Sequence, residues 1–399
     1  MSVTVAELKR EFPLLSRELG GQPITYLDCA STAPRPRAVL AAIARYHGEY
    51  CANVHRGVHA LSAEASEAFE AARHTIAAHL GASAGEVIFT AGVTDAANLA
   101  AQALAFDASS EIVTTQAEHH SNLLPWRRQA RLRMLPMRED GCSDFDALAD
   151  VCTPDTKLIA VHHVSNVLGS LAPIARITEF ARSRGILTFV DGAQAAGHLE
   201  VDVRALGCDF YAFSGHKVGG PSGTGALYVR SEVLDALAPS RVGGGMVARV
   251  GSDACEFKTG VQRFEAGTPN IEGVLGLAAA LQLLAQLGPR AIEEHSRALA
   301  AQMLEECSRL PGVRVLGARD ARERIPLVAL ALPEQGLDAE SVARTLSDGF
   351  GVLVSAGRHC AHPLHTTLGV EATLRASAWI CNDADDVERL VRALRGLVT

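Results

Sequence analysis

The length, composition and charge of the chain exclude several classes of protein. Its 399 residues are 48% hydrophobic and 21% charged, which is ordinary for a globular protein with two or three packed domains. A formal net charge of -8, with no stripe of lysine and arginine, argues against a nucleic-acid binder and favours work on small molecules. No apolar run approaches the roughly 20 residues of a membrane helix, and the N-terminus lacks a secretory signal, so we expect a cytoplasmic protein with no membrane segment.

The first 80 residues predict short elements and one irregular loop. The expected elements are a short helix and an extended connection over 5–20, a small strand at 26–28, a helix over 36–50 and an amphipathic, alanine-rich helix over 62–80. The polar stretch between the two longer helices contains His55 and Arg56. This stretch is either a surface loop or part of the lining of an anionic site.

From residue 87 onward, short apolar runs alternate with helical stretches. The predicted strands cover 87–90, 111–115, 158–163, 187–190, 210–213 and 226–229. Helices are expected over 95–105, 123–131 and 173–184. Strands that alternate with helices predict an α/β fold in which helices cover both faces of a mainly parallel sheet.

Polar side chains follow the ends of these predicted strands. They are Thr94, His119, Asn166, Asp191, Gln194, Ser214, His216 and Lys217. Ligands of open α/β sheets bind beyond the carboxyl ends of the strands. We therefore expect these side chains to converge on one edge of the sheet.

After about residue 260 the pattern changes to that of a smaller α+β domain. Helices are expected over 273–287, 289–309, 338–348 and 383–396, and strands over 313–316, 326–332, 352–354 and 374–380. The predicted division is an N-terminal segment over 1–20 that packs on the small domain, a large domain over 21–272, and a small domain over 273–399 that carries the Cys360 loop. The helix at 273–287 could belong to either domain.

Four residues at the predicted edge invite a chemical explanation. Lys217 lies in a glycine-rich turn, in a chain with four lysines and thirty-three arginines, and an amine forms an imine with an aldehyde where a guanidinium practically cannot. Asp191 is either a cap or a carboxylate that holds a pyridine nitrogen protonated. His119 is either structural or a ring that stacks on another ring and moves protons. Thr94 is either a plain helix cap or part of a phosphate site at a helix N-terminus.

Histidine and cysteine patterns do not predict a metal site. The doublets at 119–120 and 162–163 supply at most one ligand each, because neighbouring residues in a strand point to opposite faces. Nine cysteines without a Cys-x-x-Cys pair oppose a zinc ribbon or an iron–sulfur site and are typical of thiols in a reducing compartment. Cys360 stands beside Arg358 and His359, which favour a thiolate, so it is either reactive or an inert thiol.

Together these motifs resemble the fold type I pyridoxal-phosphate enzymes, specifically the class V aminotransferase family. Within that family the chain is most similar to the group II (SUF-type) cysteine desulfurases and selenocysteine lyases. The motifs that carry the resemblance, which extends over practically the whole chain, lie at 53–59, 118–122, 163–169, 190–194, 213–217, 263–268, 357–361 and 375–377. The resemblance implies a mainly parallel, seven-stranded large domain, pyridoxal 5′-phosphate as the cofactor, and a homodimer with shared active sites.

The resemblance also implies roles for individual residues. At the cofactor it places Lys217 as the lysine that forms the imine and moves the proton, with His119 stacked on the ring. Asp191 is implied at the pyridine nitrogen and Gln194 at the phenolic oxygen. The residues implied at the phosphate are Thr94, Ser214 and His216, with Thr268 at the phosphate of the other subunit. At the substrate it places Arg375 as the carboxylate clamp, Asn166 near the same carboxylate, and His55 and Arg56 nearby.

The activity implied is the conversion of L-cysteine, or a related sulfur or selenium amino acid, to alanine. Cys360 takes the sulfur as a persulfide and passes it to an acceptor protein, for example in iron–sulfur cluster assembly. Three departures from the family pattern stand out: Ser355 and Arg358 replace the first arginine and first histidine of Arg-x-Gly-His-His-Cys-Ala, and Val93 replaces a common threonine. The alternatives are a C–S lyase or another class V reaction, in which Cys360 is dispensable, and a non-catalytic scaffold that docks sulfur carriers.

Overall fold

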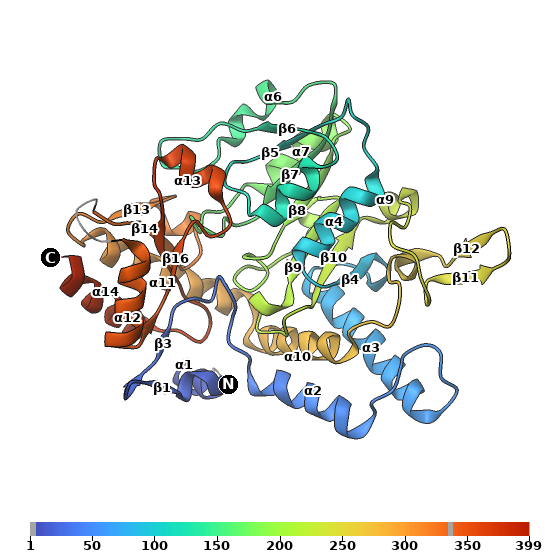
Figure 1. Ribbon diagram of the computed structural model, residues 1–399, viewed down its shortest axis with the longest axis horizontal. Coiled ribbons are helices and arrows are strands. Elements are labelled where there is room, and N and C mark those ends of the chain that lie inside the picture. The colour runs from blue at the N-terminus through green and yellow to red at the C-terminus, as the bar shows by residue number, and fades with distance from the viewer. Residues whose placement is uncertain (1–4, 334–337, 399) are drawn as a thin grey trace.

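A seven-stranded sheet forms the centre of the larger body of the molecule in the computed structural model, which describes residues 5–333 and 338–398 (Figure 1). In spatial order the strands are β4 (Val87–Thr90), β10 (Gly225–Val229), β9 (Phe210–Ser214), β8 (Leu187–Asp191), β7 (Thr156–His162), β5 (Glu111–Thr114) and β6 (Arg131–Met134). The strands from β9 to β6 are parallel, and β10 is antiparallel to both of its neighbours. The expected mainly parallel α/β sheet is confirmed.

Helices cover both faces of this sheet because successive strand residues point to opposite faces. In β7, for example, Ile159 packs in one apolar cluster and Leu158 in another. The helices that pack on the Ile159 side are α2 (Arg37–Glu49), α3 (Ala60–His79), α7 (Ile174–Ser183) and α10 (Ile271–Leu287). The helices on the Leu158 side are α4 (Val93–Leu104), α5 (Leu124–Arg127) and α9 (Ser231–Ala236).

A smaller antiparallel sheet forms the C-terminal body. Its strands, in spatial order, are β13 (Arg314–Leu316), β14 (Leu327–Ala331), β17 (Thr373–Ser377) and β16 (Ser355–Gly357). The helices α11 (Pro289–Ser308), α12 (Ala339–Phe350) and α14 (Ala384–Val398) pack on this sheet. In the N-terminal segment, which includes α1 (Val5–Arg10), β3 (Thr25–Tyr26) pairs in parallel with β15 (Val352–Leu353). The expected domain boundaries stay a prediction. Helix α10 begins at the expected boundary between the large and the small domain, and it packs on α2 and α3.

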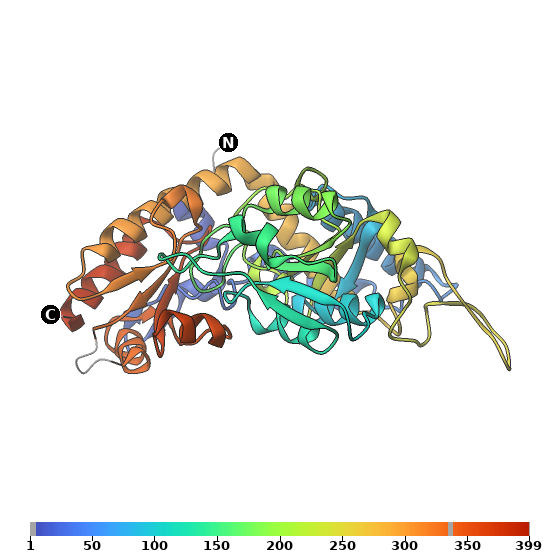
Figure 2. The ribbon, with the colours of Figure 1, turned by 90° about the horizontal axis from the view of Figure 1, so that it is seen from above.

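Several elements differ from the expectations. The helix expected over 123–131 was wrong in length: α5 has four residues, and the chain then enters the edge strand β6, whose arginines alternate with Leu132 and Met134. The hairpin β11 (Val247–Val250) and β12 (Cys255–Phe257), the strand β16 and the helix α13 (His362–Leu368) were not predicted. The hairpin extends away from the larger body (Figure 2). Its strands are mostly exposed, so they lack the apolar alternation by which strands are recognised.

In the described part of the chain no helix is by itself long and apolar enough to cross a membrane. Helices α10 and α11 reach that length and apolarity as a pair, but the chain bends by 82° between them.

A buried ion pair connects α3 to the segment after residue 264. Arg73 is 3% exposed and donates two bonds to the Glu265 carboxylate, at 2.7 and 2.9 Å, and a third to the carbonyl of Val87. Breaking a buried pair leaves a charge without compensation. We therefore expect Arg73→Met to lower the free energy of unfolding by about 3–5 kcal/mol, measured by urea denaturation. Arg45→Met, which removes an exposed pair with Glu49, should leave it unchanged, and equal effects would contradict this prediction.

Candidate active site

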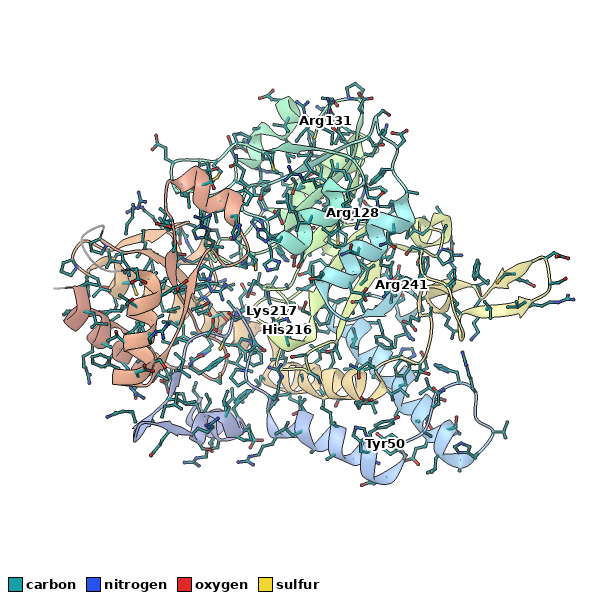
Figure 3. All side chains as sticks on the ribbon, viewed as in Figure 1. Tyr50, Arg128, Arg131, His216, Lys217 and Arg241 are labelled. Carbon is teal, nitrogen blue, oxygen red and sulfur yellow. The ribbon has the colours of Figure 1, made fainter. Side chains whose placement is uncertain are left out.

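A cavity of about 400 Å³ lies at the carboxyl edge of the large sheet, beside the C-terminal body. His216 and Lys217 lie there, between the two bodies (Figure 3). The cavity is lined by ten of the predicted site residues: Thr94, His119, Asn166, Asp191, Gln194, Ser214, His216, Lys217, Cys360 and Arg375. Parallel strands end at this edge, so side chains that follow different strands come together here.

Three other predicted site residues lie outside this cavity. Thr268, His55 and Arg56 line a larger cavity of about 700 Å³, which does not include Lys217. The His55 ring approaches the Glu70 carboxylate at 3.3 Å. The smaller cavity is the better candidate for the reaction, because it holds the amine, the thiol and the buried carboxylate together.

Lys217 ends a short helical turn, η5 (Gly215–Lys217), directly after β9. Burial lowers the pKa of Lys217 to about 8; Asp191 opposes this shift, and the positive charge of Arg375 adds to it. A substantial fraction of this amine is therefore neutral, and so nucleophilic, near physiological pH.

This pKa predicts how Lys217 reacts in the cofactor-free protein. Modification of Lys217 by an amine-reactive reagent should rise with pH and level off above about pH 8, because the neutral amine is the reacting form. The modified fraction can be measured by mass spectrometry of the peptide that contains the residue. An inflection near pH 10.5, the ordinary value for a lysine, would contradict the prediction.

Asp191 is the last residue of β8 and is 6% exposed. Among the described residues, the Ala193 N–H donates a hydrogen bond to this carboxylate, at 2.9 Å. Burial holds the pKa of Asp191 above its ordinary value, although Lys217 and the Ala193 N–H oppose this. The carboxylate thus has spare acceptor capacity that faces the cavity.

His119 is neutral at physiological pH, and its tautomer is fixed. Burial, with the charge of Lys217, lowers the pKa of His119 to about 4. Its Nδ1 accepts a bond from the N–H of Ser121 at 3.1 Å, so the ring proton lies on Nε2. Nearby, Gln194 is held by a bond of 2.9 Å from its Nε2 to the carbonyl of Ala30.

The start of α4 forms the other end of the cavity. Gly92 precedes the helix with φ 135°, and a Cβ at this position would lie 2.9 Å from the Ser214 hydroxyl. That hydroxyl accepts the N–H of Val93 at 3.0 Å, and the Thr94 hydroxyl lies 2.6 Å from that of Ser121. Free N–H groups and hydroxyls at a helix N-terminus suit an anion.

Arg375 is 3% exposed and lies on β17 at the opposite side of the cavity. Its guanidinium donates to the carbonyl of Asn166 at 2.9 Å and to the hydroxyl of Ser31 at 2.6 Å, and it approaches Asp28 at 3.3 Å. Its buried Nε has no hydrogen-bond partner among the described residues. The side chain of Asn166 donates to the carbonyl of His359 at 2.8 Å, which connects Arg375 to the Cys360 loop.

The Cys360 loop is exposed and has an unusual backbone. His359 and Cys360 have φ angles of 46° and 55°, in the left-handed region that few residues other than glycine adopt. The N–H of His120 donates to the carbonyl of Cys360 at 2.9 Å and fixes the loop against the large body. Arg358 donates a hydrogen bond from Nε to the carbonyl of Glu371, while Ser355, on β16, lines the cavity.

The structure adds site residues that the sequence reasoning missed. Ser31, Ser121 and His162 line the cavity with the predicted residues. Ser121 lies in a motif that was singled out, but Ser31 meets Arg375 across 344 residues, a pairing that leaves no local sequence pattern. Among the described residues, no three histidine, cysteine or acidic side chains are grouped so that they could hold a metal ion.

Comparison with known proteins identifies the family. Residues 25–390 match the model of the aminotransferase class-V family. A probable cysteine desulfurase from Xylella fastidiosa is 42% identical over 395 residues, which are 97% of this chain and 94% of that protein. The cysteine desulfurase of Cronobacter sakazakii is 40% identical over 404 residues, 99% of this chain and 98% of that protein.

Solved structures agree with these sequence matches. The apo cysteine desulfurase from Thermococcus onnurineus superposes with a TM-score of 0.94 at 36% identity, over 100% of this chain and 99% of that one. The Escherichia coli cysteine desulfurase CsdA, in an S-sulfonic acid form, superposes with a TM-score of 0.89 at 36% identity, over 100% of both chains. The chain therefore belongs to the class V aminotransferase family. Within it, the chain groups with the cysteine desulfurases, as its motifs predict.

Proposed function

We propose that this protein is a pyridoxal-phosphate-dependent cysteine desulfurase that converts L-cysteine to L-alanine and keeps the sulfur on Cys360. The observation that carries the proposal is that Cys360 lines the same cavity as the amine of Lys217 and the guanidinium of Arg375. The atoms balance: the C–S bond of cysteine breaks, its sulfur joins Sγ of Cys360 as a persulfide, and alanine leaves.

The residues of the cavity fit the cofactor. The buried Asp191 carboxylate has spare acceptor capacity for a protonated ring nitrogen, and the start of α4 offers N–H groups to a phosphate. Lys217, His119, Gln194, Ser214 and His216 line the space between them. When bound, pyridoxal phosphate supplies an aldehyde for the lysine amine and a ring that accepts electrons from Cα of the substrate.

The chain's own residues then have separate tasks. Arg375, with Asn166 beside it, holds the α-carboxylate of the substrate, which a planar guanidinium binds through two bonds. Nζ of Lys217 takes the Cα proton and returns it, since its pKa of about 8 allows both protonation states. The thiolate of Cys360 attacks the substrate sulfur from the exposed side of the cavity.

A second copy of the chain completes the site in this proposal. Thr268, His55 and Arg56 line a cavity apart from Lys217, so a homodimer with shared sites would bring them to the partner's phosphate and substrate. The fully exposed Val58, next to this stretch, supports an interface there. The exposure of Cys360 supports transfer of its sulfur to an acceptor protein, and the nine free cysteines support work in the reducing cytoplasm. Selenocysteine as a further substrate stays a prediction.

The test is alanine release from L-cysteine in the presence of a reductant. We expect Cys360→Ala to lose at least about 100-fold in rate while the yellow colour of the bound cofactor remains, because the nucleophile is removed and the cofactor site is intact. Cys255→Ala, which removes another exposed thiol, is the matched control and should behave as the parent does. A Cys360→Ala protein with parental activity would favour a C–S lyase or another class V reaction.

A further inference from the structure

A row of three ionisable side chains reaches the cavity: Glu118, His162 and Asp191. The mechanism above uses only Asp191. All three are buried, with exposures of 0%, 7% and 6%. His162 Nδ1 lies 2.7 Å from Oε1 of Glu118. On the other side, His162 and Asp191 are register partners in the parallel strands β7 and β8, and both line the cavity. Register partners on neighbouring strands point to the same face of a sheet, so the imidazole lies beside the carboxylate.

Three groups besides the His162 ring donate hydrogen bonds to the Glu118 carboxylate. It accepts from the Thr115 hydroxyl at 2.8 Å, the Asn122 amide at 2.7 Å and the main-chain N–H of His162 at 3.1 Å. The orientation of the Asn122 amide is set by Trp126, whose ring N–H donates to Oδ1 at 3.0 Å. These bonds hold the Glu118 carboxylate beside the His162 ring, where Oε1 can accept a bond from Nδ1–H.

His162 lies between two carboxylates, those of Glu118 and Asp191, and both favour its protonated form. Burial lowers the pKa of His162, but Glu118, and then Asp191, outweigh burial and raise the pKa above its ordinary value. His163, the next residue, is equally buried but bonds the Tyr211 hydroxyl, and burial lowers its pKa to about 4. Two further charges act on the pKa of Asp191: the amine of Lys217 lowers it, and the carboxylate of Glu118 raises it.

We propose that His162 is a positioning residue: held by Glu118, its imidazolium keeps the Asp191 carboxylate ionised and able to hold a proton on the cofactor's ring nitrogen. This rests on the proposed function for its catalytic consequence, but the protonation of His162 is a property of the chain itself. Burial alone would favour a neutral Asp191, which could not stabilise a protonated ring. The two neighbouring histidines thus differ in this proposal: His162 is charged and His163 is neutral.

The experiment compares three variants of the holoenzyme: His162→Gln, Glu118→Gln, and His163→Gln as the matched control. Two readouts are independent of turnover. One is the protonation of His162 across pH, from its ring signals in NMR spectra, assigned by their loss in His162→Gln. The other is the pH titration of the visible absorbance of the bound cofactor. Alanine release gives kcat and KM.

We expect His162→Gln to shift the absorbance titration and to lower kcat by up to about tenfold, with KM changed less than twofold. The equilibrium of a proton shared between Asp191 and the ring nitrogen changes tenfold for each unit in the pKa of Asp191, whatever the pH. Glu118→Gln should lower the pKa of His162 in the NMR titration, because its imidazole then protonates only in acid. Its effect on kcat should be smaller than that of His162→Gln, since the substitution also removes the Glu118 charge that raises the pKa of Asp191. His163→Gln should match the parent in both readouts.

A purely structural role predicts different results and would overturn the proposal. In that case Glu118→Gln would leave the NMR titration of His162 unchanged, or His162→Gln would leave the absorbance titration of the parent unchanged. Should a variant fail to fold, the parent alone decides, because a His162 ring that is neutral at about pH 6 would also refute the proposal. If the parent releases no alanine, the desulfurase assignment fails while the NMR and absorbance readouts still test His162.

Discussion

Lys217→Ala is expected to abolish alanine release from L-cysteine, with a loss of at least about 1,000-fold. The substitution removes both the amine that attaches the cofactor and the group that moves the Cα proton. No nearby side chain replaces it, because the other described lysines, Lys9, Lys157 and Lys258, do not line this cavity. The measurement is the rate of alanine formation, together with the absorbance of protein-bound cofactor after gel filtration.

Lys157→Ala is the matched control for this result. Lys157 is exposed and bonds the carbonyl of Pro154, far from the cavity, so its loss should leave both the rate and the absorbance unchanged. A Lys217→Ala protein that still releases alanine at a tenth of the parental rate would refute the role given to this amine.

Arg375→Lys is expected to weaken the use of substrate even though it keeps the positive charge. A lysine is a point charge and cannot reproduce the planar, two-pronged geometry that fits a carboxylate. Each lost hydrogen bond to a charged group costs about 1.5–3 kcal/mol, so kcat/KM for L-cysteine should fall roughly 10- to 100-fold. Most of this change should be in KM, measured by steady-state kinetics of alanine release.

Arg324→Lys separates the loss of substrate binding from a general loss of stability. Arg324 is as buried as Arg375, but it donates to the main-chain carbonyls of Ala318, Leu168 and Leu327 and does not line the cavity. Its substitution should lower the melting temperature and leave KM unchanged. Equal KM values for Arg375→Lys and the parent would exclude Arg375 as the carboxylate clamp.

Local sequence patterns predicted much of the fold and the reactive residues, because those patterns act over neighbouring residues. The apolar run at 158–163 becomes β7, and the amphipathic stretch at 62–80 becomes α3. Lys217 and Asp191 were found because each follows a predicted strand, at the edge where ligands of parallel sheets bind. The mostly exposed strands β11 and β12 were missed because nothing in their apolar pattern distinguishes them from a loop.

Contacts between distant segments were decided only by the tertiary structure. Arg375, on β17 of the small sheet, meets the carbonyl of Asn166, 209 residues away, because both residues line the cavity at the edge of the large sheet. The histidine doublet at 162–163 predicted no metal site, and the bond between His162 and Glu118 depends on the packing of β7 against the turn after β5. By itself, the sequence determined which chemical groups the chain carries and which strand each follows. The order of the strands, with β7 between β5 and β8, decided which groups meet, because hydrogen bonding between strands joins segments that no local pattern relates.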